Sequence, residues 1–283
     1  MTTILLQPAP PADQGGEALA EAVAGELGGR ARPCAHAWRI ETRAVPSPAR
    51  LETLRGRHRC DLNLLPEGFD PAAVGLVISD MDSTLITIEC IDEIADFTGL
   101  KPQVAAITEA AMRGEIDFET SLRRRVALLE GLPAEVLERV YEERLRLNPG
   151  AEVLVEGLRG RGIPFALVSG GFTVFTERLK ARLGLDFTLA NELEIAHGRL
   201  TGRVRGAIVG ARAKAAFLEE LCERLGIRHD QVIAMGDGAN DLEMLARAGL
   251  GVAYRAKPAL RARADVLIDH NGLDAVLAFL ETC

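Results

Sequence analysis

The sequence predicts an α/β protein: a doubly wound parallel sheet with a helical cap inserted after the first core strand, plus a small N-terminal α/β or α+β module. Three observations support this fold class. Short apolar runs without alternation, typical of strands buried on both faces, recur from residue 74 onward. Helical patterns separate these runs, which indicates right-handed crossovers between parallel strands. A long helical stretch interrupts this order directly after the first run.

Residues 1–70 are predicted to form the small N-terminal module. A short apolar run at residues 4–7 and extended segments at 38–45 and 60–65 surround an Ala- and Glu-rich helical stretch at 17–27. Proline and glycine separate these segments, as expected for the connections of a small folded module.

The core is predicted over residues 74–85 and 148–283. Residues 74–79, Val-Gly-Leu-Val-Ile-Ser, form its first buried strand. Later strands are expected at residues 163–169, 231–235, 250–253 and 265–268. Helices are expected at residues 153–159, 174–182, 211–225 and 241–248. This order is typical of a Rossmann-like sheet with helices on both faces.

A helical cap is predicted over residues 86–147, between the first and second core strands. Apolar residues recur at helical spacing in four stretches, at residues 91–97, 104–112, 118–129 and 136–145. An insertion at the carboxyl end of a core strand lies where a lid over a ligand site is expected. Residues 189–204 alternate in polarity and contain two glycines, so they are predicted to form a β-hairpin.

Composition and charge restrict the function classes. The 283 residues are 48% hydrophobic and 26% charged, and the formal net charge is −8 with no run dense in Lys or Arg. This distribution argues against a nucleic-acid or an anionic-membrane partner. The N-terminus lacks a basic region, and no apolar run approaches the roughly 18 residues of a membrane span. We therefore expect neither export nor membrane insertion.

The cysteines and lysines add smaller expectations. The five cysteines are scattered, without spacing that suggests a disulfide or a zinc site, so we interpret them as structural and expect a reducing cytoplasm. Most basic residues are arginine, and the lysines are only Lys101, Lys180, Lys214 and Lys257. Because lysine is rare here, each lysine is a candidate for a specific role. The sequence leaves open whether the chain forms a homodimer.

Polar residues follow three predicted strands: Asp80-Met-Asp-Ser-Thr, Ser169-Gly-Gly and Gly236-Asp-Gly-Ala-Asn-Asp. The carboxyl ends of neighbouring parallel strands share one crevice, so these segments are expected to converge. The carboxylates brought together would be Asp80, Asp82, Asp237 and Asp241. They repel one another unless a cation is bound, and oxygen ligands of this kind suit Mg²⁺. The sequence therefore predicts a magnesium site and phosphoryl chemistry.

A phosphate cradle is expected beside this metal site. Ser169 and the backbone amides near Gly170 and Gly171 are predicted to bind phosphate at the start of a helix, where unpaired N–H groups favour an anion. Lys214 is expected to supply a point charge for the same oxygens. In isolation, a Ser-Gly-Gly segment is more often a tight turn, and a lysine on a polar helix face is usually solvated.

Asp80 is the candidate nucleophile. A carboxylate can attack phosphorus directly and form an aspartyl-phosphate that water later hydrolyses. Two aspartates at spacing two allow a division of roles, in which Asp80 attacks while Asp82 protonates the leaving alcohol and later activates water. Alone, either aspartate would more often be a turn or helix-cap residue, so the interpretation depends on the other motifs.

Four motifs, in chain order, resemble those of the haloacid dehalogenase-like hydrolase family. They are Asp-x-Asp-x-Thr at residues 80–84, Ser169, Lys214 and Gly-Asp-x-x-x-Asp at residues 236–241. The resemblance covers residues 74–270 and implies a Mg²⁺-dependent phosphoric monoester hydrolase. Residues 1–70 lie outside it. In bacterial relatives a regulatory, amino-acid-binding module can occupy this position, and we assign no function to it here.

Longer stretches resemble the members of that family that hydrolyse O-phospho-L-serine, the last step of serine biosynthesis. They include the segments of the predicted cap that begin at Glu89 and at Phe118. The resemblance implies that Glu89 binds the substrate ammonium, that Arg125 binds its carboxylate, and that Met112 and Phe118 form an apolar wall. It further implies that Asn240 holds phosphate or supports the metal ligands. A zwitterionic amino acid requires such a carboxylate and guanidinium on chemical grounds as well.

Several alternatives stay open at the level of sequence. The chain could be a phosphatase or phosphotransferase for another small phosphorylated metabolite. A signalling receiver also carries a phosphorylatable aspartate at a strand end, but it needs neither a lid nor a base such as Asp82. An inactive serine-binding regulator would not need the complete set of carboxylates. Within the run at residues 123–125, at least two of the three arginines are expected at the surface.

Overall fold

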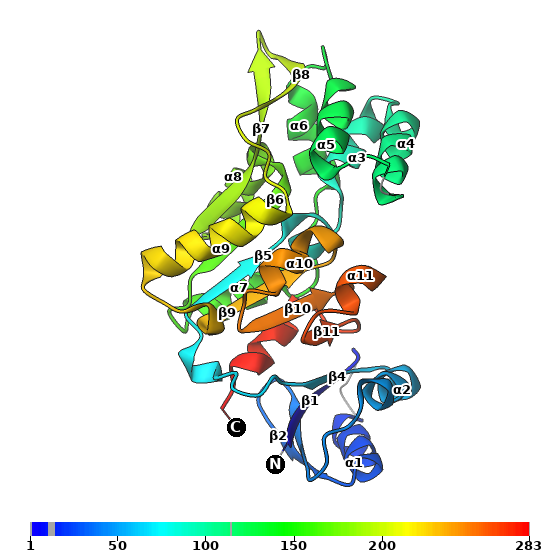
Figure 1. Cartoon of the computed structure of the whole chain (residues 1–283), viewed down its shortest axis with the longest axis vertical. Helices are drawn as coiled ribbons and strands as arrows, with labels where there is room; N and C mark the ends of the chain where they lie inside the picture. The colour runs from blue at the N-terminus through cyan, green and yellow to red at the C-terminus, as the bar shows by residue number, and fades with distance from the viewer. Residues whose placement is uncertain (1, 11–14, 114, 283) are drawn as a thin grey trace.

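The computed structural model describes residues 2–10, 15–113 and 115–282, which form two sheets with surrounding helices (Figure 1). The N-terminal sheet is antiparallel, with strand order β2-β3-β1-β4. Its elements are β1 (Thr2–Pro8), α1 (Gly16–Glu26), β2 (Arg30–Pro33), β3 (Trp38–Thr42), α2 (Pro48–His58) and β4 (Cys60–Leu64). Ile4, Leu6 and Leu54 belong to the apolar cluster that this module buries between its sheet and helices. Strand β2 and helix α2 were missing from the sequence-based prediction.

The second sheet has seven strands in the order β11-β10-β9-β5-β6-β7-β8. Neighbouring strands pair in parallel from β11 to β7, and β8 is antiparallel to β7. The strands are β5 (Leu76–Ser79), β6 (Phe165–Phe172), β7 (Phe187–Ala196), β8 (Arg199–Arg205), β9 (Val232–Gly236), β10 (Leu250–Tyr254) and β11 (Val266–Ile268). The predicted core strands and the β7–β8 hairpin are confirmed. Short turns η1 (Pro71–Ala73) and η4 (His229–Gln231) precede β5 and β9.

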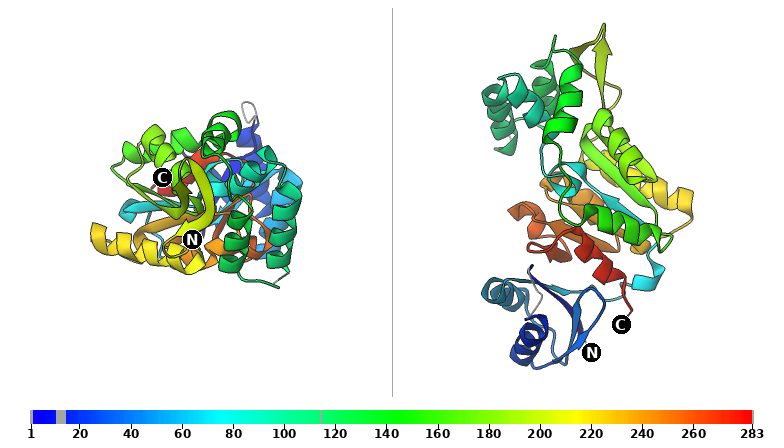
Figure 2. Two further views of the ribbon diagram at one scale, coloured as in Figure 1. Left: turned by 90° about the horizontal axis from the view of Figure 1, so that it is seen from above. Right: turned by 180° about the vertical axis from the view of Figure 1, so that it is seen from behind.

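Helices cover both faces of this sheet, so the doubly wound prediction is confirmed; α8 and α9 lie on opposite sides of the strands when viewed from above (Figure 2). In β5, Val77 belongs to one apolar cluster, whereas Leu76 and Ile78 belong to another. The first cluster includes residues of α7 (Ala151–Arg159), α8 (Thr173–Leu183) and η6 (Leu273–Leu280). The second includes residues of α9 (Ala211–Leu225), α10 (Leu242–Leu245) and α11 (Pro258–Arg261). Burial on both faces explains why this strand is apolar at successive positions.

The helical insertion follows β5. It contains α3 (Cys90–Phe97), α4 (Lys101–Met112), α5 (Phe118–Ala127), α6 (Glu135–Arg139) and a wider turn, η3 (Val140–Arg144). The chain enters and leaves it side by side, because Ile86 and Leu147 form an antiparallel bridge. The β7–β8 hairpin reaches the insertion at Gly202, where an added Cβ would lie 3.0 Å from Glu130 Cβ. This close approach, together with a φ of +74°, requires glycine.

The N-terminal module contacts the outer strand of the core sheet through buried polar side chains. Asn63 Oδ1 accepts a hydrogen bond from the backbone N–H of Leu267 at 2.9 Å, and Asn63 Nδ2 donates to the Leu267 carbonyl at 2.8 Å. The Asp61 carboxylate accepts from the backbone N–H groups of residues 269–271. Asp61 and Asn63 are each 1% exposed, so their polar groups need hydrogen-bond partners within the protein. They find these partners across the contact between the two sheets, which fixes how the sheets meet.

The cysteines differ in part from expectation. Cys34 is disulfide-bonded, which the scattered spacing of the cysteines does not indicate. Cys60, Cys90 and Cys222 are free and buried, as structural cysteines should be. Among the helices that the structure describes, none combines the length and apolar character needed to cross a membrane.

Candidate active site

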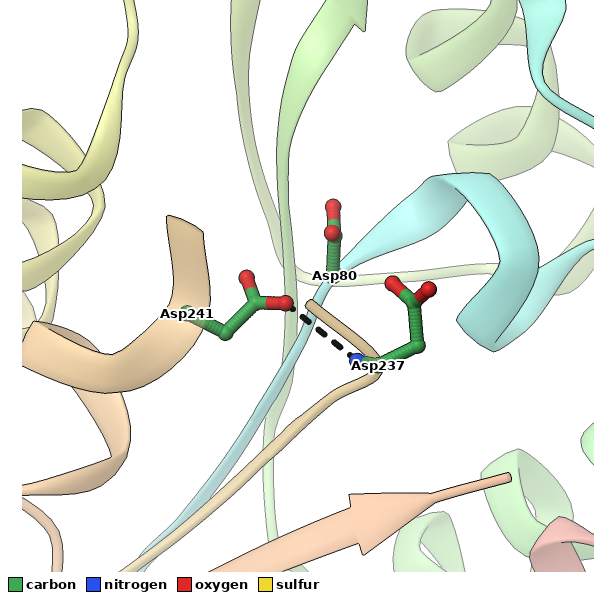
Figure 3. A group of neighbouring side chains, drawn as sticks. All are labelled: Asp80, Asp237 and Asp241. Atoms are coloured by element: carbon green, nitrogen blue, oxygen red, sulfur yellow. Dashed lines mark hydrogen bonds between the residues drawn. The ribbon is translucent and has the colours of Figure 1, made fainter. Parts of the chain in front are cut away.

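Three aspartates meet at the carboxyl ends of β5 and β9 (Figure 3). Asp80 directly follows β5, Asp237 directly follows β9, and Asp241 ends the turn η5 (Ala239–Asp241). Each contributes a carboxylate oxygen, and these oxygens lie within 4.8 Å of one another. The three residues are at most 5% exposed. Asp82, the fourth metal ligand predicted from the sequence, does not join this group.

The turn η2 (Met81–Leu85) orients Asp80. Asp80 Oδ1 accepts a hydrogen bond from the Met81 backbone N–H at 2.7 Å. Asp82 is extended, and Ser83 has a left-handed φ of 58°, so the turn is not a continuous helix. The N–H of Ile86 returns to the Met81 carbonyl at 3.0 Å and closes the turn. This tight reversal lets two aspartates at spacing two contribute to one site.

Lys214, in the first turn of α9, lies between two of the aspartates. Its Nζ is 2.7 Å from Asp80 Oδ1 and 2.8 Å from Asp241 Oδ1, and its side chain is fully buried. Burial alone would favour the neutral amine, but the carboxylates of Asp241 and Asp80 outweigh it and raise the pKa of Lys214. Burial and the neighbouring Asp241 raise the pKa of Asp80 to about 7, although Lys214 opposes the shift. The site therefore places the buried ammonium group of Lys214 beside the carboxyl group of Asp80, which has a raised pKa.

Asp241 also shapes the loop after β9. Its Oδ2 accepts from the backbone N–H of Asp237 at 3.2 Å and of Gly238 at 3.1 Å, the first of which is drawn in Figure 3. Its other oxygen accepts from Lys214. An added Cβ at Gly236 would come within 2.4 Å of the Asp241 carboxylate, so glycine is required where the loop turns around this side chain. Both Asp241 oxygens are thus engaged by donors.

Asp82 is a partly buried residue of the turn η2. Burial raises its pKa well above the usual value, and the negative charges of Glu89 and Asp80 add to the shift. Its Oδ1 is buried without a hydrogen-bond partner among the described residues. An added Cβ at Gly171 would lie 3.0 Å from Asp82 Oδ2, so this glycine allows β6 to approach Asp82 closely. Burial and the neighbouring negative charges thus favour the protonated form of this carboxyl group.

Ser169, Gly170 and Gly171 all lie inside β6, whereas the sequence predicted that the strand ends at Ser169 and that this segment lies at the start of a helix. Strand β6 continues to Phe172, and α8 begins at the next residue. Ser169 is fully buried, and its Oγ accepts from the Gly171 N–H at 2.8 Å. Asn191, which the sequence did not single out, donates to the Gly170 carbonyl at 2.9 Å and so supports the extended backbone. The segment still lies beside the aspartates, because Gly171 adjoins Asp82.

Phe118 and Glu89 bring the helical insertion to the core site. Phe118, the first residue of α5, is 37% exposed, and an added Cβ at Gly170 would lie 3.0 Å from its ring. Glu89, which precedes α3, accepts from Ser83 Oγ at 2.9 Å. Of the four substrate contacts predicted from the insertion, Glu89 and Phe118 therefore lie next to core residues of the site.

Arg125 is half-buried, whereas Arg123 and Arg124 are exposed, in agreement with the expectation for this run. Burial lowers the pKa of Arg125, and the nearby carboxylates of Asp92 and Glu89 oppose the shift. Asp92, in α3, was not singled out from the sequence, and its Oδ1 is buried without a hydrogen-bond partner among the described residues.

Asn240 and Met112 complete the predicted set. Asn240 Nδ2 is 3.4 Å from Asp80 Oδ2, a long hydrogen bond. Met112 ends α4, but its side chain lies outside the part of the chain that the structure describes.

Lys257, which precedes α11, is a basic residue of the site to which the sequence assigned no role. Its Nζ lies 3.0 Å from Asp237 Oδ2 and 3.6 Å from Glu89 Oε1. Burial raises the pKa of Asp237, and Lys257 opposes that shift. The rarity of lysine in this chain was the only signal in the sequence that could have found it.

The group formed by Asp80, Asp237 and Asp241 fits a divalent metal ion. All three donors are carboxylate oxygens, the ligand type that hard divalent cations prefer. The raised pKa values of Asp80 and Asp237 show that their negative charges lack full compensation where they are buried. A bound divalent cation would supply that compensation.

The chain is similar in sequence and fold to several known proteins. Residues 77–246 match the family model for haloacid dehalogenase-like hydrolases. A phosphoserine phosphatase from Polaromonas sp. is 54% identical over 211 residues, covering 73% of this chain and 89% of the relative. One from Albidiferax ferrireducens is 50% identical over 227 residues, covering 77% and 96%. The crystal structure of a HAD family hydrolase from Salmonella enterica serovar Typhi aligns with a TM-score of 0.88 at 35% identity, over 99% of this chain and 98% of that one.

Proposed function

This chain belongs to the phosphoserine phosphatases of the haloacid dehalogenase-like hydrolase family, and we propose that it hydrolyses O-phospho-L-serine to L-serine and phosphate through Asp80. The observation that carries the proposal is the unequal engagement of the two Asp80 oxygens. Oδ1 has the Met81 N–H and Lys214 Nζ, each at 2.7 Å, whereas Oδ2 has only the long contact to Asn240 at 3.4 Å among the described residues. Oδ2 is therefore the oxygen available to attack phosphorus.

Two steps follow from the roles of Asp80 and Asp82. In the first, Asp80 Oδ2 forms a bond to phosphorus while the bond from phosphorus to the serine oxygen breaks, and Asp82 gives its proton to that oxygen. The raised pKa of Asp82 supports this role, since the acid must be protonated beforehand. In the second, Asp82 takes a proton from water, whose oxygen attacks phosphorus and releases Asp80 with free phosphate.

The phosphate oxygens require positive charge and N–H donors. We propose that Lys214, Ser169 and the backbone amides of Gly170 and Gly171 contact them, with Asn240 in a supporting role. Mg²⁺, bound through Asp80 and Asp237, would neutralise the charge that develops on the transferred phosphoryl group. Because both oxygens of Asp241 are engaged with N–H donors, we propose that Asp241 positions Lys214 and the loop rather than binding the metal directly.

We propose that side chains of the helical insertion select the substrate. Glu89 would bind the serine ammonium and Arg125 the serine carboxylate, while Phe118 and Met112 would form an apolar wall over the site. The half-buried position of Arg125 supports this assignment, because the same run offers two exposed arginines that face water. We propose that residues 86–147 act as the cap, that residues 74–85 and 148–283 are the catalytic core, and that residues 1–70 form a module with a regulatory role still to be tested.

We further propose a cytoplasmic enzyme that acts on a small molecule without a nucleic-acid or membrane partner, either as a single chain or as a homodimer. The disulfide at Cys34 is uncommon for that compartment. Cell fractionation, together with a thiol count on the protein from each fraction, would test the location. Sedimentation would test the oligomeric state.

A phosphate-release screen tests the function. Phosphoserine, phosphothreonine and small sugar phosphates are compared with and without Mg²⁺, and we expect phosphoserine with Mg²⁺ to give the highest kcat/KM. A preference for an ester without an amino acid would contradict the serine assignment. A stable phosphoprotein without turnover would instead indicate a receiver, an outcome that the helical insertion and Asp82 argue against.

A further inference from the structure

Each of two lysines in the site pairs with two acidic residues. Lys214 lies between Asp80 and Asp241, at 2.7 and 2.8 Å. Lys257 lies between Asp237, at 3.0 Å, and Glu89, at 3.6 Å. The roles proposed for the site explain the first lysine, which contacts the candidate nucleophile Asp80. They do not explain why a second ammonium group lies on Asp237.

The two lysines differ in exposure. The Lys214 side chain is 0% exposed, whereas the Lys257 side chain is 57% exposed. A buried ammonium between two carboxylates is held in place. If the ammonium moved away, the buried carboxylates would lose their partner and the ammonium would lose both of its own. An exposed ammonium on a four-carbon chain can move into water at a lower cost than a buried one, although the carboxylate of Asp237, 8% exposed, then needs another cation. Lys257 is therefore the cation that can leave.

The backbone of Lys257 keeps its ammonium within reach of the site. The Lys257 N–H donates to the carbonyl oxygen of Asp237 at 2.8 Å, which ties the start of α11 to the loop after β9. The side chain can therefore swing away from the carboxylate of Asp237 and return, while its base stays fixed to the same residue.

Both partners of Lys257 have competing ligands under the proposed function. Asp237 is a candidate ligand of the divalent metal, and Glu89 is the candidate contact of the substrate ammonium. A divalent cation on Asp237 would repel the Lys257 ammonium, and a substrate ammonium would compete with Lys257 for Glu89. Each ligand therefore binds against competition from Lys257 while Lys257 keeps both contacts.

We propose that Lys257 is a displaceable counter-ion, which neutralises Asp237 and Glu89 in the empty site and is driven off by the metal ion and the substrate ammonium. Its link to Glu89 rests on the proposed function, whereas its competition with the metal does not. Because Glu89 precedes the first helix of the cap and Asp237 belongs to the core, one side chain couples events in the two parts of the enzyme. A ligand that removes Lys257 from one carboxylate shifts it toward the other, so binding at the two positions is energetically linked.

Calorimetric titration of the metal-free full-length chain with Mg²⁺ tests this proposal without turnover. Lys257→Met removes the charge at similar length, and we expect its Kd for Mg²⁺ to fall about three- to tenfold, because the ammonium that competes for Asp237 is gone. Lys257→Arg keeps the charge and should stay near wild type. Lys101→Met is the matched control, since Lys101 is 56% exposed and pairs with Asp96 at 3.5 Å. Unchanged or weaker Mg²⁺ binding by Lys257→Met would overturn the proposal.

A double-mutant cycle tests the link to Glu89. Glu89→Gln leaves Lys257 to pair with Asp237 alone, so we expect it to weaken Mg²⁺ binding in the wild-type background and to have a smaller effect beside Lys257→Met. Equal effects in both backgrounds would show that the two residues act independently and would remove the coupling. Because neither measurement uses phosphoserine, failure of the substrate assignment would leave both results interpretable.

Discussion

Lys214 Nζ lies 2.7 Å from Asp80 Oδ1, and the two side chains are 0% and 5% exposed. The catalytic proposal requires both an attacking carboxylate and a positive charge for the phosphate, and here the two groups already hold each other in place. Their contact depends on α9 meeting the end of β5, so the packing of the core directly sets the geometry of the chemistry.

Replacement of Lys214 by Met should destabilise the metal-free protein by about 3–5 kcal/mol, because Asp80 and Asp241 would remain buried without their partner. Urea unfolding at pH 7.5 measures the effect, and Lys101→Met serves as an exposed control. The double variant Lys214→Met/Asp241→Asn should recover part of the loss. A free energy of unfolding equal to that of the control would show that the pair is not needed for stability.

Replacement of Asp80 by Asn should lower kcat by roughly 10⁴-fold or more, since the amide cannot attack phosphorus. The fold should persist, because the change is isosteric and reduces repulsion from Asp241 and Asp237. Phosphate release and thermal unfolding check the two statements separately. Turnover at the wild-type rate would refute Asp80 as the nucleophile.

Metal binding should weaken as the pH falls below about 7, the raised pKa of Asp80. Below that pH the carboxyl group is mostly protonated, so a metal ion must displace a proton, and affinity should fall by roughly tenfold per pH unit. Above it the carboxylate is free and affinity should level off. Calorimetry in two buffers of different ionisation enthalpy should show about one proton released at pH 6 and almost none at pH 8.5. A flat affinity between pH 6 and 8 would contradict the raised pKa.

Replacement of Arg125 by Ala should raise KM for phosphoserine by about 10- to 100-fold. A rise of this size is expected when a charge-assisted hydrogen bond to the substrate carboxylate is lost. O-phosphoethanolamine lacks that carboxylate, so its KM should hardly change. Arg124→Ala is the matched control, because the neighbouring residue is exposed. An equal rise in KM for both esters would assign Arg125 to the fold of the cap instead.

The core and its polar strand ends were predictable because the physical rules involved are local. Strands buried on both faces must be apolar at successive positions, as Leu76, Val77 and Ile78 are. Parallel topology then brings the carboxyl ends of these strands together whatever their separation in sequence. By contrast, α2 buries only Leu51 and Leu54 on an otherwise polar helix, too little periodicity to detect, although Ser47 caps its start.

Other features depend on contacts between distant residues. The prediction that the strand ends at Ser169 was wrong because Asn191, on β7, satisfies the Gly170 carbonyl and lets β6 continue to Phe172. Lys257 reaches Asp237 only through the connection between β10 and β11, which no local pattern describes. These residues show where tertiary structure, not propensity, determines the site.

The pairing of Asn63 with Leu267 has a consequence for solution behaviour. Leu267 is the middle residue of β11, the outermost strand of the core sheet, and such a strand presents unpaired N–H and C=O groups on its free side. The planar carboxamide of Asn63 imitates a peptide group and satisfies both, so the first module occupies the position where another chain would add a strand. At Leu267, this edge of the core sheet is therefore closed to strand addition.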